Sequence, residues 1–290
     1  MSERSIGHGV LDAPTAPPMP QRDPARGTSV TRPRRVDVRP FPSNRRLVTA
    51  ALRAGRHTVP MHGLLELDVT DATHLLAAHD PPQSLTAFVV AAVGRAVASH
   101  PEVHAYRNWR GRLVIHHHVD VSTIVEITTP QGPFPLVHTI RDADIRDVED
   151  LSAELRRVKA TPFRRDAGAY QRLLPVVTRV PGLIRALYAL LSRSVRLRQR
   201  SGTVTVTAVG MFADGGGFAV APLALMSLQV VVGGLTERPR VIGDRVDIRS
   251  VLDLTVSVDH NVVDGGPATR FGAELRRQIE TAEVLADPIR

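Results

Sequence analysis

The chain has 290 residues and a formal net charge of +8, with 43% hydrophobic, 23% charged and 4% aromatic residues. This is the composition of a globular protein, and no uninterrupted apolar run approaches the ~20 residues that span a bilayer. The absence of cysteine from the sequence excludes disulfides, thiolate metal sites and a cysteine nucleophile.

Arginine supplies nearly all of the positive charge, because Lys159 is the only lysine. A basic chain suggests nucleic-acid binding, but the low aromatic content leaves few surfaces on which bases could stack, and no base-reading motif is visible. We therefore expect no nucleic-acid partner. Lipoyl domains carry their cofactor on a lysine at a hairpin tip, whereas Lys159 lies in a helical pattern. We therefore expect no covalently bound lipoyl group.

Residues 1–36 are rich in Pro, Arg and Ser and show no hydrophobic period, which predicts a disordered basic tail before one domain over residues 37–290. The first residues lack the apolar stretch of a secretory signal, so the expected location is the cytoplasm. Ser43 is the predicted cap of a helix over 44–54, and alternating residues predict a strand over 65–70.

The following pattern predicts alternating helices and strands. Ser84 is a plausible cap for a helix over 85–99, and a further helix is expected over 145–158. Strands are predicted over 113–127, 134–140, 204–206, 226–235, 241–248 and 252–258. A last helix is expected with Pro267 at its first position. The sum is an α/β domain whose helices pack against a large, mixed and largely antiparallel sheet.

Residues 170–200 combine apolar residues with arginines and end in Arg193, Arg196, Arg198 and Arg200. A basic amphipathic helix of this kind can lie on an anionic membrane surface or dock a partner. Burial against the sheet or a neighbouring subunit is the alternative. Pro175 and Pro181 shorten the continuous run, which favours burial.

The most informative stretch is 252–266, where alternating residues predict a strand that ends at Asp259 and delivers His260. Asp264 and Gly265 are predicted to form the next turn. An imidazole fixed by a rigid strand, with a carboxylate four residues on, suits a general base. A surface histidine beside an Asp-Gly turn is the alternative, and spacing alone does not decide between them.

Two other features have plainer interpretations. His116 and His118 would share one face of a strand, but two imidazoles without a third ligand make a poor metal site, and we expect no metal. The loop 214–217 lacks the lysine of a P-loop and the setting of a dinucleotide-binding turn. We interpret it as a flexible turn without a phosphate role.

Three stretches carry a family resemblance. Residues 259–265 resemble the signature D-H-R-x-x-D-G, residues 202–212 resemble G-T-F-T-I-S-N-L-G-M-F, and residues 44–70 resemble M-R-x-x-x-A, V-P-H and E-V-D-V-T. These elements belong to the catalytic domain of the dihydrolipoamide acyltransferases of 2-oxoacid dehydrogenases and the related chloramphenicol acetyltransferases. The resemblance covers about residues 40–285 and implies a member without its own lipoyl domain.

The resemblance implies a chloramphenicol-acetyltransferase-like two-layer sandwich that forms a trimer or a larger shell, with coenzyme A or acyl-coenzyme A as substrate. His260 would be the general base, and the Thr207 hydroxyl would stabilise the oxyanion. Asp264, supported by Gly265, would hold the histidine loop. In the chloramphenicol enzymes this aspartate pairs with an early arginine, for which Arg46 is the candidate here. A solvated helix residue is the alternative for Arg46.

Two departures bear on the acceptor. The arginine that usually follows the catalytic histidine is Asn261, and the asparagine after the oxyanion hydroxyl is Ala208. Three functions stay open: acyl transfer to a thiol of the dihydrolipoyl type carried by a partner protein, acyl transfer to an amine or hydroxyl outside such complexes, and a weakly active or structural core.

Overall fold

The computed structural model describes residues 36–41, 43–129, 132–160, 181–209 and 215–286. The chain divides into two units, residues 1–40 and 41–290. In the first unit, residues 36–40 form neither helix nor strand. Most of the predicted tail and residues 161–180 lie outside the described residues. Every element below belongs to the second unit.

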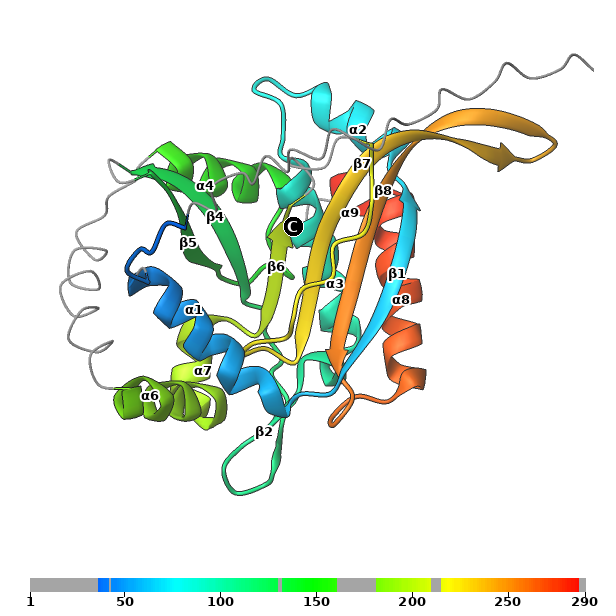
Figure 1. Cartoon of the computed structure of the whole chain (residues 1–290). Helices are drawn as coiled ribbons and strands as arrows, with labels where there is room; N and C mark the ends of the chain where they lie inside the picture. Colours follow the sequence, from blue (N-terminus) through cyan, green and yellow to red (C-terminus); the bar gives the residue numbers. More distant parts are fainter. Residues whose placement is uncertain (1–35, 42, 130–131, 161–180, 210–214, 287–290) are drawn as a thin grey trace, which may run out of the picture. The chain divides into compact units, whose positions relative to one another are not determined.

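The second unit alternates helices and strands (Figure 1). Its helices are α1 (Ser43–Ala54), α2 (Thr70–Ala77), α3 (Leu85–Ser99), α4 (Val148–Ala160), α6 (Pro181–Arg193), α7 (Val195–Ser201), α8 (Gly265–Glu280) and α9 (Glu283–Ala286), with 3-10 turns η1 (Gly55–His57) and η2 (Pro101–His104). Its strands are β1 (Pro60–Asp68), β2 (Tyr106–Arg107), β3 (Leu113–Val114), β4 (Val121–Thr129), β5 (Gly132–Ile140), β6 (Val204–Ala208), β7 (Leu228–Ile242) and β8 (Arg245–Asp259).

Six strands form one sheet in the order β1-β8-β7-β6-β4-β5. The pairs β1/β8, β7/β8 and β4/β5 are antiparallel, while β6 runs parallel to both of its neighbours, β4 and β7. The sheet is therefore mixed and largely antiparallel, as the sequence predicts.

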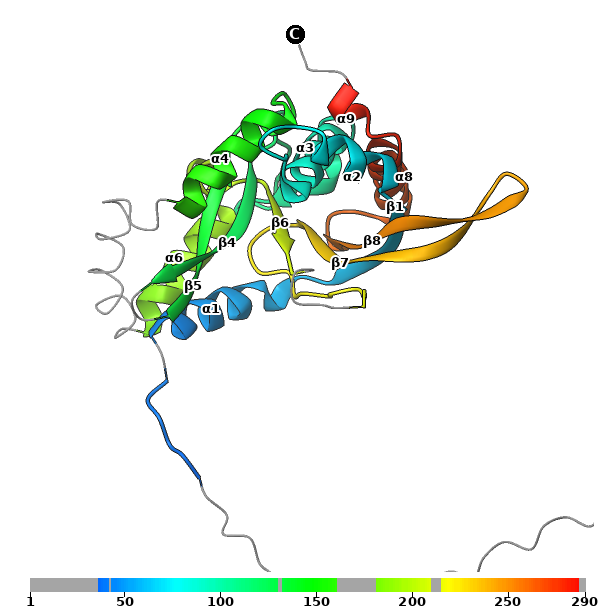
Figure 2. The same cartoon turned by 90° about the horizontal axis from the view of Figure 1, so that it is seen from above.

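Helices cover one face of this sheet and build the core with it. Figure 2 shows α2, α3, α4, α8 and α9 on one face and α1 on the other. The fully buried side chains include Phe88 of α3 and Phe271 of α8, because apolar residues recur at helical spacing on both helices. The Ser84 hydroxyl accepts from the Ala87 backbone N–H at 3.4 Å, which confirms the predicted cap.

The prediction of one strand over 113–127 is wrong. Leu113 and Val114 pair with Tyr106 and Arg107 in a separate two-stranded sheet, and the large sheet resumes only at Val121. Between them, His116 is buried and stacks on Tyr106 at a centroid distance of 5.8 Å. The alternating pattern continued through this segment, but packing of the His116 ring outweighs strand pairing.

The ends of two elements also differ from prediction. Strand β1 ends at Asp68, because the Asp68 carboxylate accepts from the Thr70 N–H at 3.0 Å and from the Thr70 hydroxyl at 2.7 Å. Thr70 therefore begins α2. Helix α8 begins at Gly265, so Pro267 is its third residue, still within the first turn, where a missing N–H costs no helical bond.

Strands β7 and β8 form one long hairpin whose far end projects beyond the rest of the sheet (Figures 1 and 2). The chain reverses at Gly243, whose φ of 64° favours glycine. A bulge lies between Val232 and Leu235. There a Cβ at Gly233 would come within 2.5 Å of the Gly217 carbonyl oxygen, so the loop before β7 packs directly on the bulge.

A buried carboxylate anchors that loop. Asp253 of β8 is fully buried, and its Oδ2 accepts from the Gly217 N–H at 2.7 Å and from Arg238 Nη2 at 2.5 Å. Arg238 Nη1 also donates to Glu66, which lies directly opposite Asp253 across β1 and β8. Two carboxylates facing each other would repel, and the Arg238 guanidinium bridges them while Arg240 supplies a second positive charge to Glu66.

Replacing Arg238 by leucine is expected to lower the free energy of unfolding by about 3 kcal/mol, because it leaves the Asp253 charge buried without a partner. Arg245→Leu is the matched control. Its pair with Asp247 is exposed, and we expect a loss below about 0.5 kcal/mol. Urea unfolding of both variants measures the difference, and equal losses would contradict the role assigned to Arg238.

Candidate active site

The backbone turn after β8 holds His260. Asp259 Oδ1 accepts three hydrogen bonds, from the backbone N–H of Val59 at 3.1 Å, from the backbone N–H of Asn261 at 3.1 Å and from Asn261 Nδ2 at 2.8 Å. The His260 N–H donates to the Val59 carbonyl at 2.7 Å. The segment that enters β1 is thereby tied to the turn that carries the imidazole.

The His260 ring has a defined tautomer. Its Nδ1 lies 3.0 Å from the Val263 carbonyl oxygen. Because a carbonyl can only accept, Nδ1 must carry the proton, and in a neutral ring Nε2 then holds the free lone pair. The imidazole side chain is 46% exposed, so Nε2 is available to take a proton from a bound substrate.

Thr207 lies near the end of β6 and is 9% exposed. Val204 and Val206 are fully buried in the core, so alternation along the strand directs Thr205 and Thr207 to the opposite face of the sheet.

The strand register separates His260 from Thr207 within one chain. Thr207 pairs with Val231 of β7, which pairs with Thr255 of β8. His260 lies five residues beyond Thr255 and two strands away from β6. Strand geometry gives a separation of roughly 20 Å, so the two side chains cannot act together within one chain.

Comparison with known proteins identifies the family of the chain. A model of the 2-oxoacid dehydrogenases acyltransferase family (catalytic domain) matches residues 34–165 and 193–286. The chain belongs to this acyltransferase family. The interval between the two matches, residues 166–192, overlaps most of the arginine-rich segment 170–200.

Curated relatives of the chain are acyltransferase components of dehydrogenase complexes. It is 25% identical over 280 residues to a dihydrolipoyllysine-residue acetyltransferase component of the pyruvate dehydrogenase complex of Corynebacterium glutamicum, covering 92% of this chain and 36% of the relative. It is 23% identical over 251 residues to a lipoamide acyltransferase component of the branched-chain complex of Pseudomonas aeruginosa, covering 83% of this chain and 51% of the relative. The chain thus spans about half or less of these relatives.

Solved structures of the family share the fold. The Azotobacter vinelandii dihydrolipoamide acetyltransferase is 18% identical, with a TM-score of 0.64 over 94% of this chain and all of that chain. The cubic core of a pyruvate dehydrogenase multienzyme complex is 19% identical, with a TM-score of 0.63 over the same shares. These similarities establish an acyltransferase catalytic-core fold.

The other family positions lie apart from the His260 ring or contact it weakly. Asp264 Oδ1 is 3.9 Å from His260 Nδ1, and the carboxylate is 90% exposed. Asp264 precedes α8 as its N-cap residue without a side-chain cap bond, and Gly265 is the first helical residue, so neither forms the predicted turn. Arg46 is exposed on α1, and no ion pair joins it to Asp264 in the described part of the chain.

Asn261 stands where the family usually has arginine, and its side chain is part of the turn. Besides the bond to Asp259, Asn261 Nδ2 donates to the His57 carbonyl at 3.0 Å. Ala208, at the other departure from the family pattern, packs against the hydrophobic core beside Thr207.

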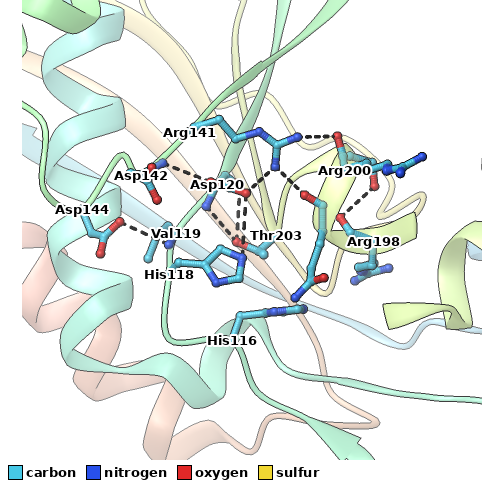
Figure 3. Close-up of polar contacts among 12 residues, drawn as sticks. His116, His118, Val119, Asp120, Arg141, Asp142, Asp144, Arg198, Arg200 and Thr203 are labelled. Carbon is cyan, nitrogen blue, oxygen red and sulfur yellow. Dashed lines mark hydrogen bonds and ion pairs between the residues drawn. The ribbon is translucent and has the colours of Figure 1, made fainter. Parts of the chain in front are cut away.

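An arginine-carboxylate network positions the strand that carries Thr207 (Figure 3). Arg141 donates to Asp120 Oδ2 at 2.5 Å and to the backbone carbonyls of Gln199 and Arg200 at the end of α7. The Asp120 carbonyl accepts from the Thr203 N–H at 2.7 Å. The residue before β6 is thereby hydrogen-bonded to the residue before β4. Asp120 and Arg141 carry no motif, so sequence reasoning did not single them out.

The histidines near β3 do not form a metal site within the described chain. No three His, Cys, Asp or Glu side chains of the described residues could hold a metal ion. His116 and His118 stand edge to face at 5.0 Å, and His104 Nε2 lies 3.1 Å from the His116 carbonyl oxygen. Burial lowers the pKa of His104 to about 4, and burial also lowers the pKa of His116.

The arginine-rich segment is helical where the structure describes it. Helix α6 packs against α1 and is followed by α7. Leu183, Leu187 and Leu190 are 41 to 50% exposed, so these leucines are not buried within the single chain, and burial against a neighbouring subunit stays a prediction. None of the described helices is long and apolar enough to cross a membrane.

Acid is expected to destabilise the protein through His104. The unfolded chain binds a proton at this imidazole near pH 6.5, whereas the folded chain does so only near pH 4, so the unfolding free energy falls as pH drops through this range. Between pH 7.5 and pH 5 the loss from His104 is about 2 kcal/mol.

His104→Asn keeps a donor for the His116 carbonyl but does not titrate, so its stability should fall less over this range. Urea unfolding at the two pH values measures the difference, with the exposed His117→Asn as control. A loss in His104→Asn as large as in wild type would rule out His104 as the titrating group.

Proposed function

We propose that the protein is an acyltransferase that moves an acyl group between coenzyme A and a small acceptor, with His260 as general base. The observation that carries the proposal is the tautomer of His260: the Val263 carbonyl holds the Nδ1 proton, and Nε2 is left free on a rigid strand end. The family's acyltransferase relatives support the reaction class.

The reaction follows from these groups. His260 Nε2 removes the proton of the attacking thiol, and the resulting thiolate adds to the acyl carbonyl. The negative charge that develops on the carbonyl oxygen is stabilised by the Thr207 hydroxyl of a second subunit. When the tetrahedral intermediate collapses, the leaving thiolate recovers the proton from the His260 imidazolium.

Assembly is then a condition of activity. The roughly 20 Å between His260 and Thr207 in one chain requires that a second copy supply one of them. We propose a symmetric trimer or a larger shell. Support comes from the projecting β7–β8 hairpin, which exposes Val241, Val246 and Ile248 by 67 to 75%, and from the multienzyme core whose fold the chain shares.

The acceptor is a dihydrolipoyl-type thiol carried by a partner protein, or a small amine or hydroxyl compound. One of the solved relatives was studied for the roles of a serine, a histidine and an asparagine four positions after that histidine in its mechanism. In this chain Thr207, His260 and Asp264 have a comparable spacing, which supports the same division of labour.

His260→Ala is expected to lower the rate of acyl transfer from acyl-coenzyme A at least about 100-fold, because the thiol loses its proton acceptor. Release of free thiol from a panel of acyl-coenzyme A donors and acceptors measures the rate. His117→Ala replaces an exposed histidine elsewhere and should leave the rate unchanged. Equal rates for wild type and His260→Ala would favour a structural core without this chemistry.

Mixed oligomers test the shared site. Thr207→Ala should lose about 100-fold in rate, while Thr207→Ser keeps the hydroxyl and most of the activity. Co-expression of His260→Ala with Thr207→Ala should restore activity to about one quarter of the sites, because some interfaces then combine an intact His260 with an intact Thr207. Mixed oligomers, verified by two affinity tags, that stay inactive would exclude a site built from two subunits.

A second candidate function is attachment to an anionic membrane surface. Helices α1, η1, α6 and α7 contain nine arginines and neither Asp nor Glu. The exposed leucines of α6 supply an apolar stripe on the same surface. This combination of arginine and leucine is typical of interfacial helices.

The full-length protein should then sediment with vesicles containing phosphatidylserine and not with neutral phosphatidylcholine vesicles, and Leu187→Gln should weaken this binding. Val241→Gln, on the distant hairpin, is the control. Absence of vesicle binding, together with a change of oligomeric state in Leu187→Gln, would assign the leucine stripe to a subunit contact instead.

A further inference from the structure

Unpartnered polar atoms concentrate at one place in the domain. Among the described residues, ten buried side-chain nitrogen and oxygen atoms lack a hydrogen-bond partner. Five of them belong to residues grouped around the Tyr106 ring: His104 Nδ1, Tyr106 Oη, His116 Nε2, Arg198 Nε and Ser227 Oγ. Buried polar atoms are rarely left without partners, so these five atoms are available to a polar ligand or to water.

Arg198 is the centre of this group. Its side chain is 3% exposed, its guanidinium carbon lies 4.4 Å from the centroid of the Tyr106 ring, and Nη1 donates to the Leu225 carbonyl. No described carboxylate forms an ion pair with it. Burial lowers the pKa of Arg198 to about 10, so the group is still a cation at neutral pH. A buried cation without an anion is unfavourable, and an anionic ligand would relieve that cost.

The group opens onto a cleft of about 590 Å³, a size typical of small-molecule sites. Tyr106, Arg198 and Ser227 line it, with the exposed side chains of Arg107, Trp109 and Arg193. Arg107 and Arg193 add positive charge, and Trp109 offers a flat apolar surface. Figure 3 shows Arg198 on α7 and His116 on the neighbouring segment.

The acidic residue that lines this cleft is already occupied. Asp259 is among the lining residues, but its Oδ1 accepts three hydrogen bonds within the His260 turn. Nor do the two buried imidazoles compete with Arg198 for an anion, because burial lowers their pKa and keeps them neutral. The cleft therefore combines a cation that forms no ion pair with a described carboxylate, two hydroxyls without a hydrogen-bond partner, and one carboxylate whose Oδ1 is held by N–H groups of the His260 turn.

We propose that this cleft binds a small organic anion whose carboxylate or phosphate group pairs with Arg198 and accepts hydrogen bonds from Tyr106 and Ser227. The ligand would lie next to the His260 turn, because Asp259 and Asn261 of that turn line the same cleft. His260 itself is not among the lining residues, so the site is distinct from the proton acceptor and does not depend on acyl transfer.

Binding to the full-length protein tests the proposal without any turnover. The probes are inorganic phosphate and succinate, titrated at constant ionic strength while heat and melting temperature are measured. Wild type should bind at least one of them saturably and melt at a higher temperature. Phosphate alone would identify a phosphorylated ligand, and succinate alone a carboxylic acid. Binding of neither probe overturns the proposal.

Four variants locate the site. Arg198→Gln should raise the dissociation constant of the bound probe about 100-fold, and Arg196→Gln, an exposed arginine of the same helix outside the cleft, should not change it. Ser227→Ala and Tyr106→Phe should each raise it about tenfold. Without a probe, these two variants should melt at or above the wild-type temperature, because the hydroxyl they remove has no partner.

The two hydroxyl variants keep the test decisive if Arg198→Gln does not fold. Ser227→Ala and Tyr106→Phe that bind the probe as tightly as wild type would overturn the proposed site. So would an Arg196→Gln variant that loses as much affinity as Arg198→Gln, because the binding would then reflect only the general positive charge of α7.

Discussion

The carboxylate of Asp259 determines how the candidate catalytic histidine is held. By accepting three N–H groups with a single oxygen, it joins the segment before β1 to the end of β8. Hydrogen bonds to a charged acceptor are about twice as strong as neutral ones, so these bonds hold the turn firmly against the segment before β1. The imidazole ring then needs only the Val263 carbonyl to fix its tautomer. Asp259 and Val263, which make these contacts, lie within three residues of His260 in the sequence.

The sheet imposes a second constraint, which acts over a longer range. Because β6 runs parallel to β7 and β8 runs antiparallel to it, the carboxyl ends of β6 and β8 point in opposite directions along the sheet. The proposed proton acceptor, His260, and the proposed oxyanion hydroxyl, that of Thr207, therefore lie far apart in one chain. If both act in catalysis, each subunit supplies one half of the site, which is a physical reason for a cyclic assembly.

Much of the fold could be predicted from the sequence because caps and hydrophobic periodicity within single elements determine it. Helix α3 has the predicted limits, since its cap at Ser84 and its apolar stripe agree. The end of β8 at Asp259 also has its predicted position. Predictions failed where a single contact outweighs the pattern: His116 packing on Tyr106 interrupts the strand before β4, and the Asp68 bonds to Thr70 end β1 early.

The candidate site could be predicted only in part, for the same physical reason. His260 and Thr207 lie on strands whose pattern is clear, but Asp120, Arg141 and Arg198 act through contacts distant in sequence. Arg198 in particular lies in a run of exposed arginines, where nothing in the pattern distinguishes the one that is buried.

The replacement of the family's arginine by Asn261 is explained by what the asparagine does. Its amide donates to the His57 carbonyl and to Asp259, so the side chain closes the turn and does not extend toward a substrate. An arginine there would bring a charge to the side of the imidazole, but it would lack the short amide that bridges the His57 carbonyl and the Asp259 carboxylate. A positive charge near this turn comes from Arg198, which lies on α7 and lines the same cleft as Asp259 and Asn261. The departure at position 261 therefore leaves the His260 turn closed by hydrogen bonds.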